Sequence, residues 1–115
     1  MMARRLTLAI VALQLAGCAS LSAGDPSLYQ RLAESDVTLA ARLVQSTLES
    51  TPDGTRRSWT NQQTGNAGAI TPLRTYVSER GHFCREYREE LTVADGTGRF
   101  YHTACREDGA RWIWL

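Results

Sequence analysis

A short apolar run that ends in small residues and a cysteine constrains this chain more than any other feature. Residues 1–5 carry two arginines, residues 6–15 are mostly apolar, and Ala16 and Gly17 lead directly into Cys18. The apolar run is about half of the roughly 20 residues that a membrane-spanning helix needs, so it fits the core of a cleavable signal peptide. We predict cleavage before Cys18 and a lipid on its thiol. The alternatives are an ordinary secretory signal or a buried apolar N-terminus.

The predicted cleavage divides the chain into three parts. Residues 1–17 form the lipoprotein signal peptide, residues 18–34 the lipidated N-terminus and tether, and residues 35–115 the folded domain. The 98 residues that remain of 115 are enough for one small domain. Ala19, directly after the lipidated cysteine, favours the outer membrane by general analogy with other lipoproteins. Three acyl chains would make this attachment effectively permanent.

The charge balance and the absence of known site motifs exclude several classes of function. Without Arg4 and Arg5 the mature chain has 11 basic and 12 acidic residues, a net charge of −1. This balance gives no electrostatic basis for binding nucleic acid. The sequence contains no nucleophile elbow, no glycine-rich phosphate loop and no metal-ligand motif. We therefore expect no cofactor and no catalysis.

Helical periodicity is found only in the first part of the domain. Asp25-Pro26 is typical of the start of a short helical turn, and Ser35-Asp36 is a second start signal. Apolar residues then recur at helical spacing, namely Val37, Ala40, Ala41, Val44 and Leu48. Residues 51–54, Thr-Pro-Asp-Gly, end the helix. The apolar face is expected to pack against a sheet.

The chain beyond Gly54 is predicted to be extended. A loop rich in Gly, Asn and Gln covers residues 61–69, and five short strands are expected at residues 57–60, 73–78, 82–93, 99–106 and 111–115. The predicted fold class is therefore α+β, with one amphipathic helix packed on a small antiparallel sheet of four to five strands and one disulfide.

The two longest strands are predicted to form a hairpin that carries the disulfide. Asp95-Gly96 between two alternating runs is among the strongest hairpin signals. With these two residues at the turn positions, Cys84 and Cys105 share one face and lie diagonally; a shift of two residues would place them directly opposite each other. An even pair of cysteines in an exported, oxidising compartment is expected to form a disulfide.

A zinc site is an alternative use of the same cysteines. His82, Cys84, His102 and Cys105 supply four nitrogen and sulfur ligands, the number found in structural zinc sites. However, His102 and Cys105 are three residues apart and point to opposite faces of a regular strand. The disulfide is therefore the favoured prediction.

The charged residues of the same hairpin have two interpretations. Glu86, Glu89 and Glu90 could include a general acid. Because they are interleaved with Arg85 and Arg88, we predict instead a solvated strand face with charges paired across strands.

Several motifs occur in a fixed order between residues 32 and 112. They are Trp59-x-Asn61, Thr64-Gly65-x-x-Gly68-x-Ile70-x-Pro72, Tyr76, Gly81, Cys84-Arg85-Glu86-Tyr87, Ala104-Cys105-Arg106 and Asp108-Gly109-x-x-Trp112. As a set they resemble the C-terminal domain of the 17 kDa surface antigen lipoproteins of proteobacteria. The resemblance implies outer-membrane attachment and an antigenic label, but no settled biochemical activity. Gln62 stands where the family usually has proline, and the glycine-zipper segment of many members is absent here, so the resemblance supports only a tethered soluble domain.

These observations predict a structural or binding role at the cell envelope, with peptidoglycan or an envelope protein as partner. The candidate binding residues are Arg85, Glu86, Arg106, Trp59 and Trp112, the first three as a polar cluster around the disulfide. Tyr76, Tyr101 and Trp114 are further aromatics that could stack on sugars or anchor an interface, although most of these rings are expected to fill the core. Alternatives are a lysozyme inhibitor that uses Arg85, Arg88 and Arg106, and an envelope hydrolase.

Overall fold

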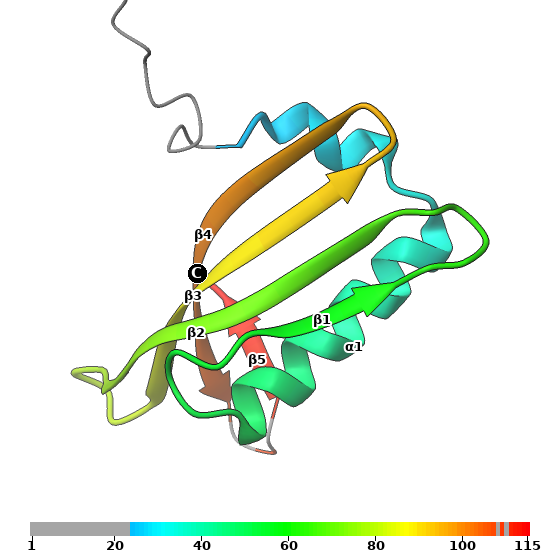
Figure 1. The fold of residues 1–115 in the computed structure, drawn as a ribbon. Coiled ribbons are helices and arrows are strands. Elements are labelled where there is room, and N and C mark those ends of the chain that lie inside the picture. Colours follow the sequence, from blue (N-terminus) through cyan, green and yellow to red (C-terminus); the bar gives the residue numbers. More distant parts are fainter. Residues whose placement is uncertain (1–23, 108, 110) are drawn as a thin grey trace, which may run out of the picture.

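A five-stranded antiparallel sheet curls around one long helix in the computed structural model, which describes residues 24–107, 109 and 111–115 (Figure 1). The elements in chain order are η2 (Pro26–Arg31), α1 (Glu34–Ser50), β1 (Arg57–Thr60), β2 (Ala67–Val77), β3 (Phe83–Val93), β4 (Gly96–Glu107) and β5 (Arg111–Trp114). Each strand pairs with its sequence neighbour, in the order β1-β2-β3-β4-β5. The predicted α+β class is confirmed. The predicted signal peptide and Cys18 lie outside the described residues.

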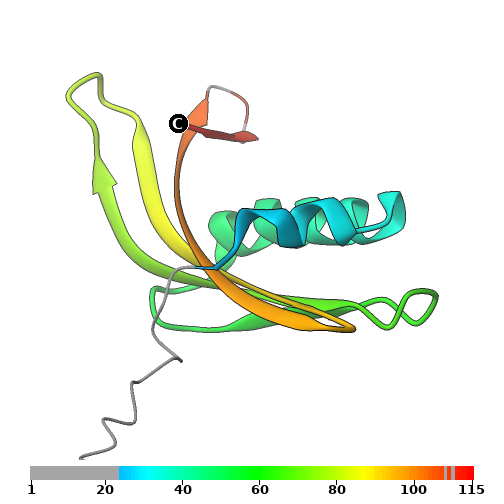
Figure 2. The same cartoon turned by 90° about the horizontal axis from the view of Figure 1, so that it is seen from above.

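Both helical elements lie on the concave side of the curled sheet (Figure 2). α1 packs against β1, β2 and β5, and the 3-10 helix η2 packs against β3 and β4. The largest fully buried apolar side chains between these layers are Tyr87, Leu48, Ile70 and Leu91, each at most 1% exposed. Within the described ranges, neither helical element is long and apolar enough to cross a membrane.

The buried face of α1 differs in part from the predicted stripe. Ala40, Val44 and Leu48 are buried as expected, and Asp36 and Thr47 are buried with them. Val37 is 51% exposed and Ala41 is exposed too, so their assignment to the core face was wrong. The physical reason is that Asp36 and Ala40 face inward. Because adjacent helical residues point about 100° apart, the residues that follow them, Val37 and Ala41, are turned away from the buried face.

Strand β2 begins earlier than its composition indicates. Residues 67–69 were predicted to belong to a loop, but they pair with β1 on one side and β3 on the other. Pro72 is accommodated because β1 ends its pairing at Ile70, so the missing N–H of Pro72 falls beyond the reach of that neighbour. A register shift follows between Pro72 and Arg74.

The β3–β4 hairpin has a turn different from the predicted one. Val93 pairs with Gly96, so Ala94 and Asp95 form the two-residue connection, and the register is shifted by two residues from the prediction. Gly96 and Gly98 lie within β4, where a Cβ on Gly98 would be 2.7 Å from Cδ1 of Leu28. These glycines therefore make room for η2 and do not form the turn.

The shifted register places Cys84 directly opposite Cys105. The two sulfur atoms form the predicted disulfide, with Cα atoms 4.0 Å apart and a separation of 21 positions in sequence. The bond joins β3 to β4, and Cys105 itself pairs with Ile113 of β5. Its sulfurs belong to the convex face, opposite the face that α1 covers.

Candidate functional site

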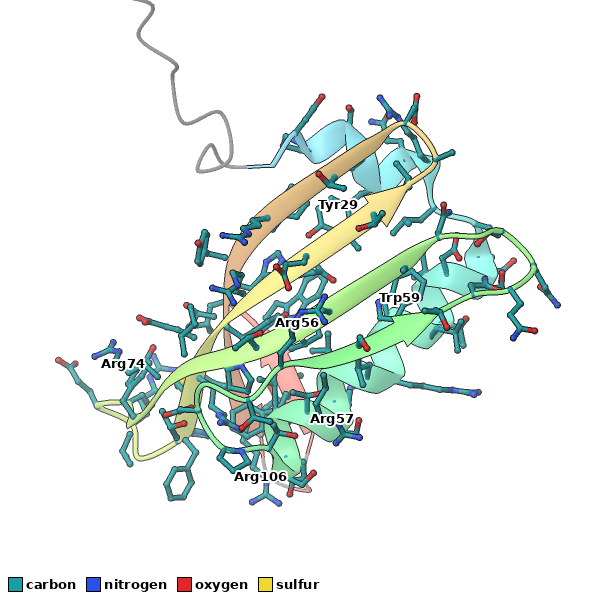
Figure 3. The ribbon with its side chains drawn as sticks, in the orientation of Figure 1. Tyr29, Arg56, Arg57, Trp59, Arg74 and Arg106 are labelled. Carbon is teal, nitrogen blue, oxygen red and sulfur yellow. A yellow bond between two sulfur atoms is a disulfide. The ribbon has the colours of Figure 1, made fainter. Side chains whose placement is uncertain are left out.

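The two tryptophans predicted as possible binding residues lie in the core. Trp59 and Trp112 are each 6% exposed. Trp59 packs with Ala40 and Leu91 between β1 and α1 (Figure 3), whereas Trp112 belongs to the core cluster around Tyr87. In this arrangement neither ring presents an open face to a ligand.

Trp112 also links strand β5 to the helix. The Gln45 amide donates to the Trp112 carbonyl at 2.8 Å and accepts from the Trp112 N–H at 3.0 Å. The indole Nε1 of Trp112 donates to Oε2 of Glu49 at 2.9 Å. Gln45 of α1 thus provides hydrogen-bond partners for the backbone N–H and carbonyl groups of Trp112 in the edge strand. This explains how a four-residue strand is held in place.

Arg85 is a buried cap for the end of α1. Its side chain is 8% exposed, and its guanidinium donates to the carbonyls of Leu48 and Thr51 at 2.7 Å each. A 2.8 Å ion pair with Asp53 completes the site. The last carbonyls of a helix lack partners within the helix and carry partial negative charge, so a buried guanidinium is well placed there. The hydrogen bond from Arg85 also lowers the pKa of Asp53.

The predicted polar cluster of Arg85, Glu86 and Arg106 is not brought together as one unit. Arg85 faces the helix on the concave side, while Glu86 faces outward and pairs with Arg74 at 3.0 Å. Arg106 pairs with Glu49 at 2.9 Å, near the C-terminal end of α1 (Figure 3). Each of the three residues therefore has its own partner.

Asp36 organises the loop between β1 and β2. The carboxylate is fully buried and accepts hydrogen bonds at 2.7–2.8 Å from Asn61, Thr64, Asn66 and the Ala33 N–H. Burial by itself would raise the pKa of Asp36, but these hydrogen bonds outweigh it and lower the pKa to about 2. Asp36 was predicted as part of a helix start signal, and this network was not predicted.

A second buried carboxylate joins η2 to the sheet. Glu89 accepts a short hydrogen bond from the Tyr29 hydroxyl, and Nε2 of His102 lies 3.0 Å from its Oε1. The Tyr29 hydroxyl oxygen and Nε2 of His102 are 3.1 Å apart. Glu89 is 4% exposed, so its predicted place on a solvated strand face was wrong. The alternation Arg85, Tyr87, Glu89 along one strand face could have indicated this burial.

The chemistry of this cluster favours a structural role. Burial, followed by the hydrogen bond to Glu89, raises the pKa of Tyr29 well above its usual value, and burial also raises the pKa of Tyr87. A phenol with a raised pKa is a poor base or nucleophile near neutral pH. The His102 ring stacks on Trp114, with ring centroids 5.3 Å apart and planes 3° apart.

The structure uses the cysteines in a way that opposes the zinc alternative. Both sulfurs are committed to the disulfide, and His102 points to the other face of β4 toward Glu89. In the described part of the chain no group of three His, Cys, Asp or Glu residues is arranged to hold a metal ion.

Two exposed aromatic side chains lie near the end of β5. Tyr101 is 63% exposed and Trp114 is 58% exposed. Both residues and the half-buried Tyr76 border a hollow of about 410 Å³ beside Thr103 of β4. By strand register Tyr101 lies on the convex face of the sheet, whereas Trp114 pairs with Ala104 and stacks on His102 on the concave face.

Comparison with known proteins identifies the family. The sequence model described as "17 kDa outer membrane surface antigen" matches residues 46–113. The chain belongs to this family. The 17 kDa surface antigens of Rickettsia felis, Rickettsia bellii and Rickettsia prowazekii are 38%, 37% and 35% identical to it over 79 residues, which are 69% of this chain and 50% of each relative. The chain thus spans about half the length of the curated relatives it matches. No solved structure matches it.

The motifs on which the resemblance to the family was based hold the fold of this surface antigen domain together. Asn61 and Thr64 bind Asp36, and Arg85 caps α1. Gly65 has a φ of +75°, which favours glycine, in the same loop. Cys84 and Cys105 form the disulfide. Several residues of these motifs therefore stabilise the packing of the helix against the sheet.

Proposed function

We propose that this member of the surface antigen family is an outer-membrane lipoprotein, anchored through Cys18, whose domain has a structural or binding role at the cell envelope without catalysis. The observation that carries the proposal is the match to a family described as an outer-membrane surface antigen in a chain with a Leu-Ala-Gly-Cys signal at residues 15–18. The disulfide is consistent with an exported, oxidising compartment.

The use of the polar side chains supports a role other than catalysis. Asp36 and Arg85 are two of the most deeply buried charged residues, and both form hydrogen bonds within the domain. Glu89 is bonded to Tyr29, whose raised pKa is unsuited to proton transfer near neutral pH. The side chains that remain accessible include aromatic rings and paired arginines, which are typical of binding surfaces.

Inhibition of a host lysozyme is a weaker hypothesis for this fold. It requires Arg85, Arg88 and Arg106 to enter an acidic cleft. Arg85 is 7% exposed and bonded to the end of α1, and Arg106 is paired with Glu49. We therefore do not propose this function.

The proposed anchoring can be tested by expressing the chain in a Gram-negative host. Mass spectrometry of the purified protein should show an N-terminus at Cys18 with diacylglycerol and an acylated amine, and fractionation should place it in the outer membrane. Cys18→Ala should abolish the lipid. The matched control, Cys84→Ala with Cys105→Ala, should keep the lipid because those sulfurs belong to the domain. An unlipidated protein in the soluble periplasm would refute the proposal.

A further inference from the structure

We propose that the open edge of β2 at residues 73–77 pairs with the same edge of a second copy of this chain, so that two copies form one continuous antiparallel sheet. β1 pairs with β2 only from Ala67 to Ile70, and β2 continues past the start of β1 to Val77 (Figure 1). Among the described residues, β3 is the one strand that pairs with β2 over residues 73–77. The other side of this segment is therefore open.

Both ends of the open edge are fixed by the chain itself. At one end Pro72 has no N–H, and its carbonyl accepts from the Gly54 N–H at 2.7 Å. At the other end Ser78 begins the turn to β3, and its N–H donates to the His82 carbonyl at 2.8 Å. Thr75 is thus the centre of the open edge. Two copies overlap along the whole edge only when Thr75 of one faces Thr75 of the other.

The backbone groups that point out of this edge belong to Thr75 and Val77. Because Ser78 bonds to His82, antiparallel alternation directs the N–H and carbonyl groups of Tyr76 toward β3 and those of Thr75 and Val77 away from it. Among the described residues these outward groups have no backbone partner. Unpaired N–H and carbonyl groups on a sheet edge are a template for another strand.

The apolar side chains of the edge are complementary to themselves. Leu73 and Val77 are 41% and 57% exposed. With Thr75 at a two-fold axis, Leu73 of one copy faces Val77 of the second copy. Phe83 is 55% exposed and is the register partner of Val77 in β3, so it adds apolar surface beside this contact. The pairing would remove apolar surface from water on both copies, which favours association.

The charges near the edge also fit a second copy. In this register Arg74, on the projecting hairpin, faces Tyr76 of the second copy and not another arginine (Figure 3). Arg74 already lies over the Tyr76 ring of its own copy, with Cζ 4.6 Å from the ring centroid. Because the paired strands are antiparallel, the turn that carries Glu79 points toward the start of β1 in the other copy. Arg57 is exposed there and has the opposite charge.

The symmetry of this pairing is compatible with two copies attached to one membrane. A two-fold axis through Thr75 runs perpendicular to the sheet, so both convex faces point to the same side. In each copy Gly24 N–H donates to the Arg99 carbonyl, so the two chains enter their domains at the same level along this axis. The contact is small for a stable interface. Attachment to one membrane, which rests on the proposed function, would raise the effective concentration of the second copy.

The test is sedimentation equilibrium of the purified lipoprotein in a density-matched detergent, over a range of protein-to-detergent ratios. The protein mass should rise from one copy to two and stop there, because a two-fold interface is closed at two. Hydrogen exchange at the Thr75 and Val77 amides should slow as the dimer forms. A single-copy mass at every ratio, growth beyond two copies, or unchanged exchange at these amides would each overturn the inference.

Substitutions at Thr75 separate edge pairing from a change in the fold. Thr75→Pro removes an N–H that points out of the sheet, so the bonds between β2 and β3 remain. It should weaken the dimer about tenfold or more, since each copy loses a hydrogen bond to the other. Thr75→Ala is the matched control, because it also loses the 3.0 Å hydrogen bond to Asp53 but keeps the N–H. Equal dimerisation by the two variants would contradict the pairing.

Opposite charges at the two ends of the edge test the register. Leu73→Lys and Val77→Glu should each weaken the dimer, because each places a charge against an apolar side chain. The double variant should recover dimerisation, since the two new charges face each other between copies but lie about 13 Å apart within one strand. Absence of recovery would overturn the inference. The lipid anchor is measured separately by mass spectrometry, and an unlipidated protein can be sedimented without detergent, so failure of the anchor is distinguishable from failure of the dimer.

Discussion

The indole ring of Trp59 lies against the backbone of Gly68, its register partner across β1 and β2. A Cβ at position 68 would lie 2.7 Å from Cε2 of the indole and 2.9 Å from the Glu90 carbonyl oxygen. The absence of a side chain at Gly68 is therefore what allows Trp59 to enter the core beside Ala40 and Leu91.

Gly68→Ala should displace this ring. We expect a loss of about 2 kcal/mol in the free energy of unfolding, because added volume in a packed core forces side chains and backbone to move. Denaturant unfolding followed by tryptophan fluorescence measures the change. In a Trp59→Leu background the same substitution should cost clearly less, since the smaller side chain leaves space for the methyl group. Equal costs in both backgrounds would contradict the proposed contact.

Asp36→Asn should destabilise the domain by about 3 kcal/mol at neutral pH, because several buried donors lose a charged acceptor. The pH dependence has a defined sign. The folded-state pKa of Asp36, about 2, lies below its ordinary value of 3.8. The stabilisation is therefore complete above pH 3.8 and is lost as the pH falls through 2.

Thermal melts between pH 2 and pH 6 measure both effects of Asp36. Asp36→Asn should remove the part of the acid sensitivity that occurs between about pH 4 and pH 2. Asp95→Asn is the control, because Asp95 lies in an exposed turn and its side chain is 73% exposed. The prediction is wrong if Asp36→Asn melts at the same temperature as the unmodified protein.

Arg85→Met should destabilise the domain by about 3 kcal/mol, since it leaves buried carbonyls at the end of α1 without donors. Arg85→Lys should recover only part of this loss, because an ammonium group cannot reproduce the fork of the guanidinium. Arg74→Met removes an exposed ion pair and should cost less than about 1 kcal/mol. Urea unfolding would test the expected order, and equal effects of Arg85→Met and Arg74→Met would disprove it.

Removal of the disulfide should lower stability by about 3 kcal/mol in the chain-entropy treatment of a loop of this length. Cys84→Ala combined with Cys105→Ala, or reduction of the unmodified protein, should lower the melting temperature to a similar extent. Free-thiol titration confirms the redox state before each melt. An unchanged melting temperature with both thiols free would show that the bond is dispensable.

Local patterns along the chain were sufficient to predict most of the secondary structure. The helical periodicity and the Thr-Pro-Asp-Gly sequence at residues 51–54 located α1, which ends at Ser50. The strand prediction for residues 57–60 matches β1, and the even pair of cysteines in an exported chain indicated the disulfide. These features were predictable because periodicity, turn residues and cysteine pairing depend on neighbouring residues or on composition.

The role of several residues depended on partners far away in sequence. Glu89 was assigned to a solvated face, but Tyr29, 60 residues earlier, binds it in the interior. Gly96 was expected in a turn, but it begins β4, where an added Cβ would lie 3.1 Å from Cδ2 of Leu28 in η2. Neither partner can be inferred from the residues next to Glu89 or Gly96.

The sequence by itself determined the elements, the disulfide pair and the family, because each of these is encoded in local spacing or in a set of ordered motifs. Tertiary structure alone decided which charged and aromatic residues are buried. The sheet curls over α1 (Figure 2). Trp59 and Trp112 are buried against this helix, whereas more than half of the Tyr101 and Trp114 side chains is exposed. Burial depends on how the layers close over one another, and a residue type does not carry that information.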